Sequence, residues 1–220
     1  MSIRIKKNKP QKDEAYISYP VEQNIKKYRN TLIIKEIHSF LELSNLKYNR
    51  SNIEKYLDEF DYVFSQGPIK EHESGFGYNE AVLFYTLLKI INPKIVIESG
   101  VMKGFTTYLV DAATGDDCKI YNYDINFDNN MFNSIKATYI NTDITNKVPL
   151  IENKKTVALW DDHTSQMDRL KFSQKYNIQY NFFDDDLSFL NIHSDGCPPI
   201  PTISMLKDIK NRKVSSETLS

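Results

Sequence analysis

Cysteine is scarce in this chain of 220 residues, and so are glycine and long hydrophobic runs. The two cysteines, Cys118 and Cys197, do not have the spacing of a metal site or a redox motif. They exclude a disulfide framework and favour a reducing compartment. No apolar segment is long enough to cross a membrane or to form a secretory signal. These absences predict a soluble, cytoplasmic protein without a membrane partner.

A strong net charge is also lacking. The formal net charge is −1, so the chain as a whole has no field that would attract nucleic acid, and none is expected as a partner. The charge is uneven, because residues 1–50 contain eleven Lys or Arg and five Asp or Glu, whereas the remainder contains seventeen and twenty-four. This distribution predicts a basic N-terminal segment, most simply a solvated helical surface, and an acidic body.

Residues 1–65 are interpreted as an N-terminal arm and helical segment. Residues 1–20 are polar, and from 21 to 64 apolar residues recur at spacings of three and four, which predicts two or three amphipathic helices. Three roles remain open for these helices: they cover one end of a sheet, roof a site, or form a homo-oligomer interface. Residues 66–220 are predicted to form the second domain.

The stretch 94–126 organises that domain. A β-branched apolar run is followed by Gly100 and Gly104, then by a helix that starts near Phe105, and then by a second apolar run that ends in Asp124. This order predicts strand, glycine turn, helix, strand and carboxylate. In nucleoside-binding α/β folds, a carboxylate at the tip of the second strand binds a ribose diol. The alternative is a tight turn that binds nothing.

Apolar runs and helical patterns continue to alternate after Asp124. This rhythm predicts a Rossmann-like, doubly wound, mostly parallel α/β sheet with helices on both faces. The five strands are expected at Ile95–Ile97, Ile120–Tyr123, Ala137–Ile140, Thr156–Trp160 and Ile178–Phe183.

The turn reads E-S-G-V-M-K-G and lacks the third glycine of a dinucleotide-binding motif. It resembles the first turn of class I S-adenosylmethionine (SAM)-dependent methyltransferases. The resemblance implies SAM as cofactor, with Gly100 and Gly104 beside its methionine end, Glu98 supporting the loop and Asp124 holding the ribose. It also implies that Asp143 reads the adenine amino group, although Asp143 is equally suited to cap a helix.

Two strand ends are acidic: L-W-D-D-H closes the fourth strand and F-F-D-D-D the fifth. Carboxylates that lie close together repel one another unless a cation compensates. Because the candidate ligands are oxygens and one imidazole, Mg²⁺, Mn²⁺ or Ca²⁺ is favoured over zinc. The alternative is a set of solvated loop tips and helix caps.

These ends are similar to those of metal-dependent O-methyltransferases of the catechol and macrolide-sugar types. The resemblance implies Asp162, Asp185 and Asp186 as metal ligands, with Asp161 and Asp184 as register alternatives. In that family the metal grips substrate oxygens and activates the attacking hydroxyl.

The catalytic base is not fixed by this resemblance. Ser165 stands where the catechol type has a lysine, which leaves His163, His193 or the metal alone to remove the proton. Each histidine is alternatively structural.

The sequence thus predicts a SAM-dependent O-methyltransferase, assisted by a divalent metal, that acts on a small hydroxylated acceptor such as a sugar or a sugar-linked group. Two alternatives remain. The D-D-D run also resembles the acidic motif of nucleotide-sugar glycosyltransferases, and a non-catalytic methyltransferase-like scaffold would retain the same fold. Class I methyltransferases usually add a sixth and a seventh strand, for which the residues after Asp186 leave little room.

Overall fold

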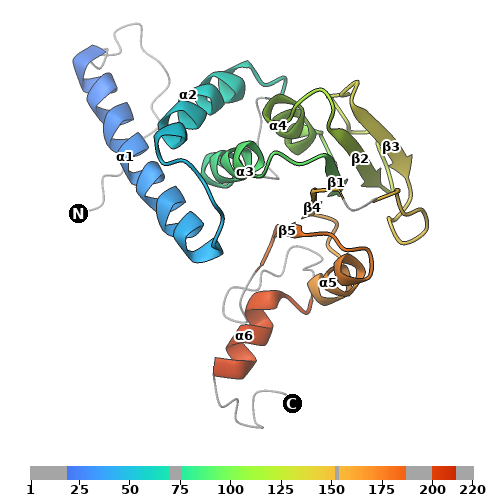
Figure 1. Ribbon diagram of the computed structural model, residues 1–220. Helices are drawn as coiled ribbons and strands as arrows, with labels where there is room; N and C mark the ends of the chain where they lie inside the picture. Colours follow the sequence, from blue (N-terminus) through green and yellow to red (C-terminus); the bar gives the residue numbers. More distant parts are fainter. Residues whose placement is uncertain (1–18, 70–75, 152–153, 187–199, 212–220) are drawn as a thin grey trace, which may run out of the picture. The chain divides into compact units, whose positions relative to one another are not determined.

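The computed structural model describes residues 19–69, 76–151, 154–186 and 200–211 (Figure 1). The chain divides into two compact units, Met1–Arg50 and Ser51–Ser220. In the first unit, helix α1 (Tyr19–Ser44) is followed by an irregular segment in which the Tyr48 hydroxyl lies 2.9 Å from Nδ1 of His38. No helix in the described part of the chain is long and apolar enough to cross a membrane.

The second unit is built on a five-stranded parallel sheet in the order β3-β2-β1-β4-β5. The strands are β1 (Ile95–Ser99), β2 (Lys119–Asp124), β3 (Ala137–Asn141), β4 (Thr156–Trp160) and β5 (Tyr180–Phe183). The helices are α2 (Ser51–Gln66), α3 (Tyr78–Ile91), α4 (Phe105–Ala113), α5 (Gln166–Lys175) and α6 (Ile203–Asn211). Strand order reverses at β1, so β2 and β4 flank it, as in doubly wound α/β folds.

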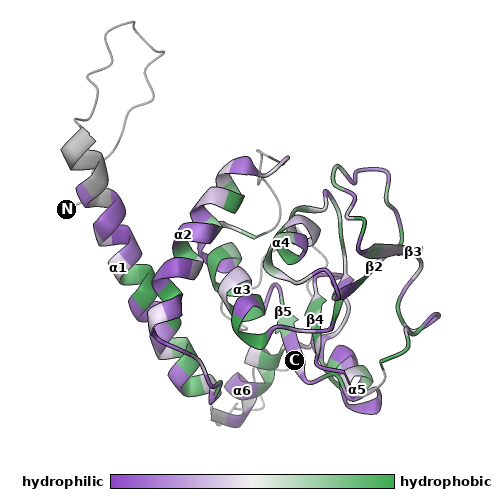
Figure 2. Cartoon of the chain, turned by 45° about the horizontal axis from the view of Figure 1, so that its top comes forward, coloured by the Kyte–Doolittle hydropathy of each residue, from purple (hydrophilic) through white to green (hydrophobic). Residues whose placement is uncertain are grey.

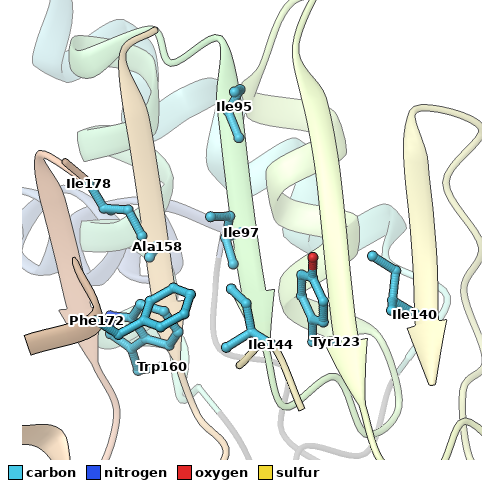
Figure 3. Packing of buried hydrophobic residues seen from close by; sticks show 9 residues of the cluster. All are labelled: Ile95, Ile97, Tyr123, Ile140, Ile144, Ala158, Trp160, Phe172 and Ile178. Carbon is cyan, nitrogen blue, oxygen red and sulfur yellow. The ribbon is translucent and has the colours of Figure 1, made fainter. Parts of the chain in front are cut away.

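Strands β1 and β4 are buried along their whole length, as expected for central strands of a parallel sheet. Successive side chains point to opposite faces, and on one face Ile95 and Ile97 join a cluster that Phe172 of α5 covers (Figure 3). On the other face Glu98 contacts the first turn of α4. Helices therefore cover both faces of the sheet.

The layer formed by α2, α3 and α4 is held by aromatic side chains. Phe60 of α2 packs against Tyr85 of α3, and Phe64 against Phe105 of α4. Helix α5 is largely hydrophilic, and purple dominates it in Figure 2. Its buried side carries Phe172 together with polar residues, which matters for the site described below.

The predicted Rossmann-like fold is confirmed, and each predicted strand is found within two residues of its expected bounds. Two details differ. Residues 125–136, which join β2 to β3, contain no helix, so the alternation is incomplete there. Helix α2, which the sequence assigned to the N-terminal segment, belongs to the second compact unit, because its apolar side chains pack on α3 and α4.

Candidate functional site

A cavity of about 990 Å³ opens at the carboxyl ends of the strands. Every strand contributes to its lining, through the tip itself or the residues that follow: Ser99 and Gly100, Asp124, Asp143, Asp161, and Asp184. Ligands of doubly wound folds bind at this edge, where the strand order reverses. The cavity is therefore the candidate functional site.

The glycine turn begins this site. Gly100 has φ +90° and Gly104 has φ +82°, both in the left-handed region that favours glycine. A Cβ atom on Gly100 would overlap the backbone carbonyl of Asp161, and one on Gly104 would overlap the side chain of Asn130. Gly100 lines the cavity whereas Gly104 does not. The space that Gly100 leaves free is thus filled by the tip of β4, which locks the turn to that strand.

Asp124 anchors the same turn from the tip of β2. Its Oδ2 accepts hydrogen bonds from the backbone N–H groups of Val101 (2.8 Å) and Met102 (3.1 Å), and its Oδ1 accepts one from Asn126 N (3.0 Å). A carboxylate has about four acceptor positions. In this arrangement one of them, on Oδ1, is left for a ligand in the cavity.

Glu98 is fully buried and does not line the cavity. Its carboxyl group accepts hydrogen bonds from the hydroxyls of Thr106 and Thr107 (2.6 Å for Thr107), and Asn122 donates to Thr107 Oγ1 (2.8 Å). Burial, opposed by these hydrogen bonds and assisted by the charge of Asp124, raises the pKa of Glu98 to about 7. Glu98 thus ties β1 to the first turn of α4.

The raised pKa of Glu98 predicts a pH-dependent stability. Because the folded state holds this proton more tightly than the unfolded state, the free energy of unfolding falls as the pH rises from about 4.5 to about 7. Glu98→Gln removes this term. Urea unfolding at pH 5 and pH 8 is expected to show a smaller loss of stability for Glu98→Gln than for the wild type.

An exposed glutamate of α3, Glu80, is the matched control. Glu80→Gln is expected to follow the wild-type pH profile within about 0.5 kcal/mol. Equal pH profiles for Glu98→Gln and the wild type would show that Glu98 is ionised throughout this range.

Asp143 lies after β3, where a turn follows instead of a helix. Its Oδ1 accepts hydrogen bonds from the backbone N–H (2.8 Å) and the hydroxyl (2.5 Å) of Thr145, and its Oδ2 forms an ion pair with Arg169. Burial alone would raise the pKa of Asp143, but the hydrogen bonds from Arg169 and Thr145 outweigh burial and lower this pKa to about 2. Asp143 is an ionised carboxylate at the cavity wall.

Asp162 shares the same cation. Arg169 Nη2 lies 2.6 Å from Asp162 Oδ2, which also accepts a hydrogen bond from the Ser99 hydroxyl (2.5 Å). Asp162 Oδ1 accepts from the Thr164 N–H (3.1 Å). Asp162 and Asp143 therefore share the single positive charge of Arg169.

Asp161 and Asp184 lie close to each other at the ends of β4 and β5. Burial and the neighbouring charge raise the pKa of Asp161 well above its usual range, and burial with the charge of Asp185 raises that of Asp184. Both residues line the cavity. Two carboxylates this close require a shared proton or a bound cation.

Asp185, His163 and Asp186 complete the two acidic ends. Nδ1 of His163 lies 3.7 Å from Oδ2 of Asp185, and both residues line the cavity with backbones in the left-handed region. Asp186 accepts hydrogen bonds from the backbone N–H (2.8 Å) and hydroxyl (2.9 Å) of Ser204 in the first turn of α6, outside the cavity lining. His193 and Cys197 lie outside the described residues.

The residues present fit a metal ion only in part. Within residues 19–69, 76–151, 154–186 and 200–211, no group of three or more His, Cys, Asp or Glu side chains is arranged to hold a metal ion. The fold therefore does not bring together the three metal ligands that the resemblance implied, Asp162, Asp185 and Asp186. The pair Asp161 and Asp184 supplies two oxygen donors, and Mg²⁺ is commonly held by one or two carboxylates with water and substrate completing its shell.

No family model and no curated protein matches the chain. Among solved structures, CmcI, in a form named D160 with Mg and SAM, is 16% identical with a TM-score of 0.45, and the match covers 54% of this chain and 58% of CmcI. A putative O-methyltransferase from Klebsiella pneumoniae is 10% identical with a TM-score of 0.46, covering 81% and 84%.

An O-methyltransferase from Bacillus cereus, in complex with S-adenosylhomocysteine (SAH), is 11% identical with a TM-score of 0.39, covering 71% of this chain and 77% of that one. The match to the Mg and SAM form of CmcI covers 58% of that chain, which is less than two thirds of its length. At these identities and TM-scores the comparisons carry no argument, and the fold is defined by the strand order itself.

Arg169 is the main site residue that the sequence reasoning missed. It is 2% exposed, and its guanidinium lies 5.3 Å from the ring centre of Trp160. One signal was available: Arg169 is the only arginine between residues 51 and 211, a region that otherwise uses lysine. Arginine is preferred over lysine where a buried cation must bind carboxylates.

Proposed function

We propose that this protein is a SAM-dependent O-methyltransferase. The main support for the proposal is the cavity at the topological switch point. It is lined by the glycine turn after β1, by the carboxylate of Asp124 at the tip of β2, which accepts hydrogen bonds from that turn, and by the carboxylate of Asp143 after β3. This arrangement offers one wall with acceptors for a nucleoside and a second wall with the acidic ends of β4 and β5.

The nucleoside half of the cavity contains Asp124 and Asp143. With Oδ1 of Asp124 open to one further donor, this carboxylate would accept a ribose hydroxyl. Asp143, ionised and fixed by Arg169, would accept a hydrogen bond from the adenine amino group. The methionine end would then lie over the turn at Gly100.

The acceptor half combines acidic and apolar residues. The apolar side chains of Ile69 and Phe76 line the cavity, and so do Asp161 and Asp184. An acceptor with hydroxyl groups on a small carbon skeleton satisfies both kinds of surface. Methyl transfer is a displacement, so holding the hydroxyl in line with the sulfonium methyl is the main contribution of the protein.

The proposal includes a divalent metal ion in the acceptor half of the cavity. Asp161 and Asp184 would hold Mg²⁺, because within the described residues no ion pair is found for these two carboxylates, whereas Asp162 pairs with Arg169. Bound there, Mg²⁺ would lower the pKa of an acceptor hydroxyl. His163, at the cavity wall beside Asp185, is the candidate to accept the proton.

The ribose role of Asp124 is tested by Asp124→Ala. The variant loses one charge-assisted hydrogen bond to the cofactor, worth about 1.5–3 kcal/mol, together with the anchor of the Val101 and Met102 amides. Calorimetric titration with SAH is expected to give an affinity at least roughly tenfold weaker than that of the wild type.

Asp128→Ala is the matched control. Asp128 is an exposed carboxylate in the segment that joins β2 to β3, and it does not line the cavity. Its SAH affinity is expected to equal that of the wild type. Undiminished SAH binding by Asp124→Ala would remove Asp124 from the cofactor site, and failure of the wild type to bind SAH would contradict the proposed function as a whole.

A further inference from the structure

Arg169 occupies a position between two parts of the cavity wall. It projects from α5, one turn after the N-cap residue Ser165, and is 2% exposed. Its Nη2 pairs with both Asp143 and Asp162, although these residues belong to the ends of different strands. Both carboxylates line the cavity, while Arg169 itself lies behind them.

The contacts of Arg169 determine the position of its guanidinium group as well as balancing charge. The guanidinium lies over the ring of Trp160, and its Nη2 also donates a hydrogen bond to the Thr164 hydroxyl (3.2 Å). With Oδ1 of Asp143 taken by Thr145, and Oδ2 by Arg169, one acceptor position on Oδ2 is left for the cavity. The direction of that position is set by where Arg169 holds the carboxylate.

We propose that Arg169 is a positioning residue for base recognition: it orients the Asp143 carboxylate, through their ion pair, to accept a hydrogen bond from the exocyclic amino group of the cofactor adenine. The inference rests on the proposed function. If Arg169 has this role, the site prefers adenine to a base that carries a keto group in place of the amino group. That preference then depends on Arg169, which does not itself contact the cofactor.

S-Inosylhomocysteine, in which the adenine amino group of SAH is replaced by a keto oxygen, is the discriminating probe. The wild type is expected to bind SAH at least about tenfold more tightly than S-inosylhomocysteine, because the keto oxygen meets the ionised Asp143 as acceptor against acceptor. Arg169→Lys retains a positive charge but not the planar group that contacts both carboxylates and Trp160. We expect it to bind the two ligands within about threefold of each other.

The ratio of the two affinities separates positioning from stability. A variant that is merely less stable loses affinity for both ligands in proportion, so the ratio stays at its wild-type value. Lys136→Met is the matched control: Lys136 is another largely buried cation, held by Asp111 and the carbonyl of Thr114, and it does not line the cavity. It is expected to lower the melting temperature and leave the ratio unchanged.

A wild-type ratio in Arg169→Lys would overturn the inference. Should Arg169→Lys not unfold cooperatively, Asp143→Asn tests the same contact, since the amide retains the shape of the side chain and loses the charge; an unchanged ratio in this variant would also overturn it. If the wild type binds neither ligand, the proposed function fails, which is a separate result from binding without discrimination.

Discussion

Gly100→Ala is expected to lower the free energy of unfolding by about 3 kcal/mol or more. Gly100 has φ +90°, which an alanine adopts only with strain, and the added Cβ would overlap the backbone carbonyl of Asp161. Backbone atoms at the tip of β4 cannot move aside as a flexible side chain would. Urea unfolding followed by circular dichroism measures the loss.

Gly115→Ala is the control for this substitution. Gly115 is exposed, and a Cβ atom there would lie 3.2 Å from Oδ1 of Asp117, an exposed side chain whose other oxygen pairs with Lys94 at the surface. The variant is expected to remain within about 0.5 kcal/mol of the wild type. A Gly100→Ala variant as stable as Gly115→Ala would mean that the turn does not pack against β4 as described.

Asp184→Asn is expected to weaken the binding of a divalent cation at least ~100-fold. This loss is larger than that caused by replacing a residue that only hydrogen-bonds to a metal ligand. The substitution replaces a ligand carboxylate by an amide of the same shape, and removes the like-charge contact with Asp161. Mn²⁺ is a paramagnetic substitute for Mg²⁺, and titration in the presence of SAH, followed by electron paramagnetic resonance, measures the affinity. SAH binding itself is expected to remain within about twofold.

Asp186→Asn distinguishes the two possible ligand sets. Asp186 is held by Ser204 at the start of α6, so its replacement is expected to change Mn²⁺ affinity by less than about threefold. The reverse outcome, in which Asp186→Asn loses the ion and Asp184→Asn retains it, would return the site to the set inferred from sequence alone.

The strands and the glycine turn were predictable because they depend on local patterns. Apolar β-branched runs and glycine spacing define them without knowledge of distant residues. The ligand register was not predictable in this way. β4 ends at Trp160 and β5 at Phe183, and one residue of shift decides whether Asp161 and Asp184 or their successors face each other.

The partners of the acidic residues also lay beyond sequence reasoning. A run of carboxylates suggests a metal, but here Arg169 from α5 forms ion pairs with two of them, Asp143 and Asp162. That contact joins residues 26 and 7 positions apart in the chain, and no short motif encodes it. In contrast, the burial of Glu98 follows from the place of β1 in a sheet that is covered on both faces, and alternation along the strand points its side chain to α4.

Calorimetric titration of the purified protein with SAH, in Mg²⁺ and again in EDTA, tests the central claim most directly. The claim predicts binding in roughly the micromolar range in both buffers, because Asp124 and Asp143 hold the nucleoside without a metal. The absence of binding heat in both buffers, under conditions in which the protein is folded, would contradict the assignment of the cavity to SAM.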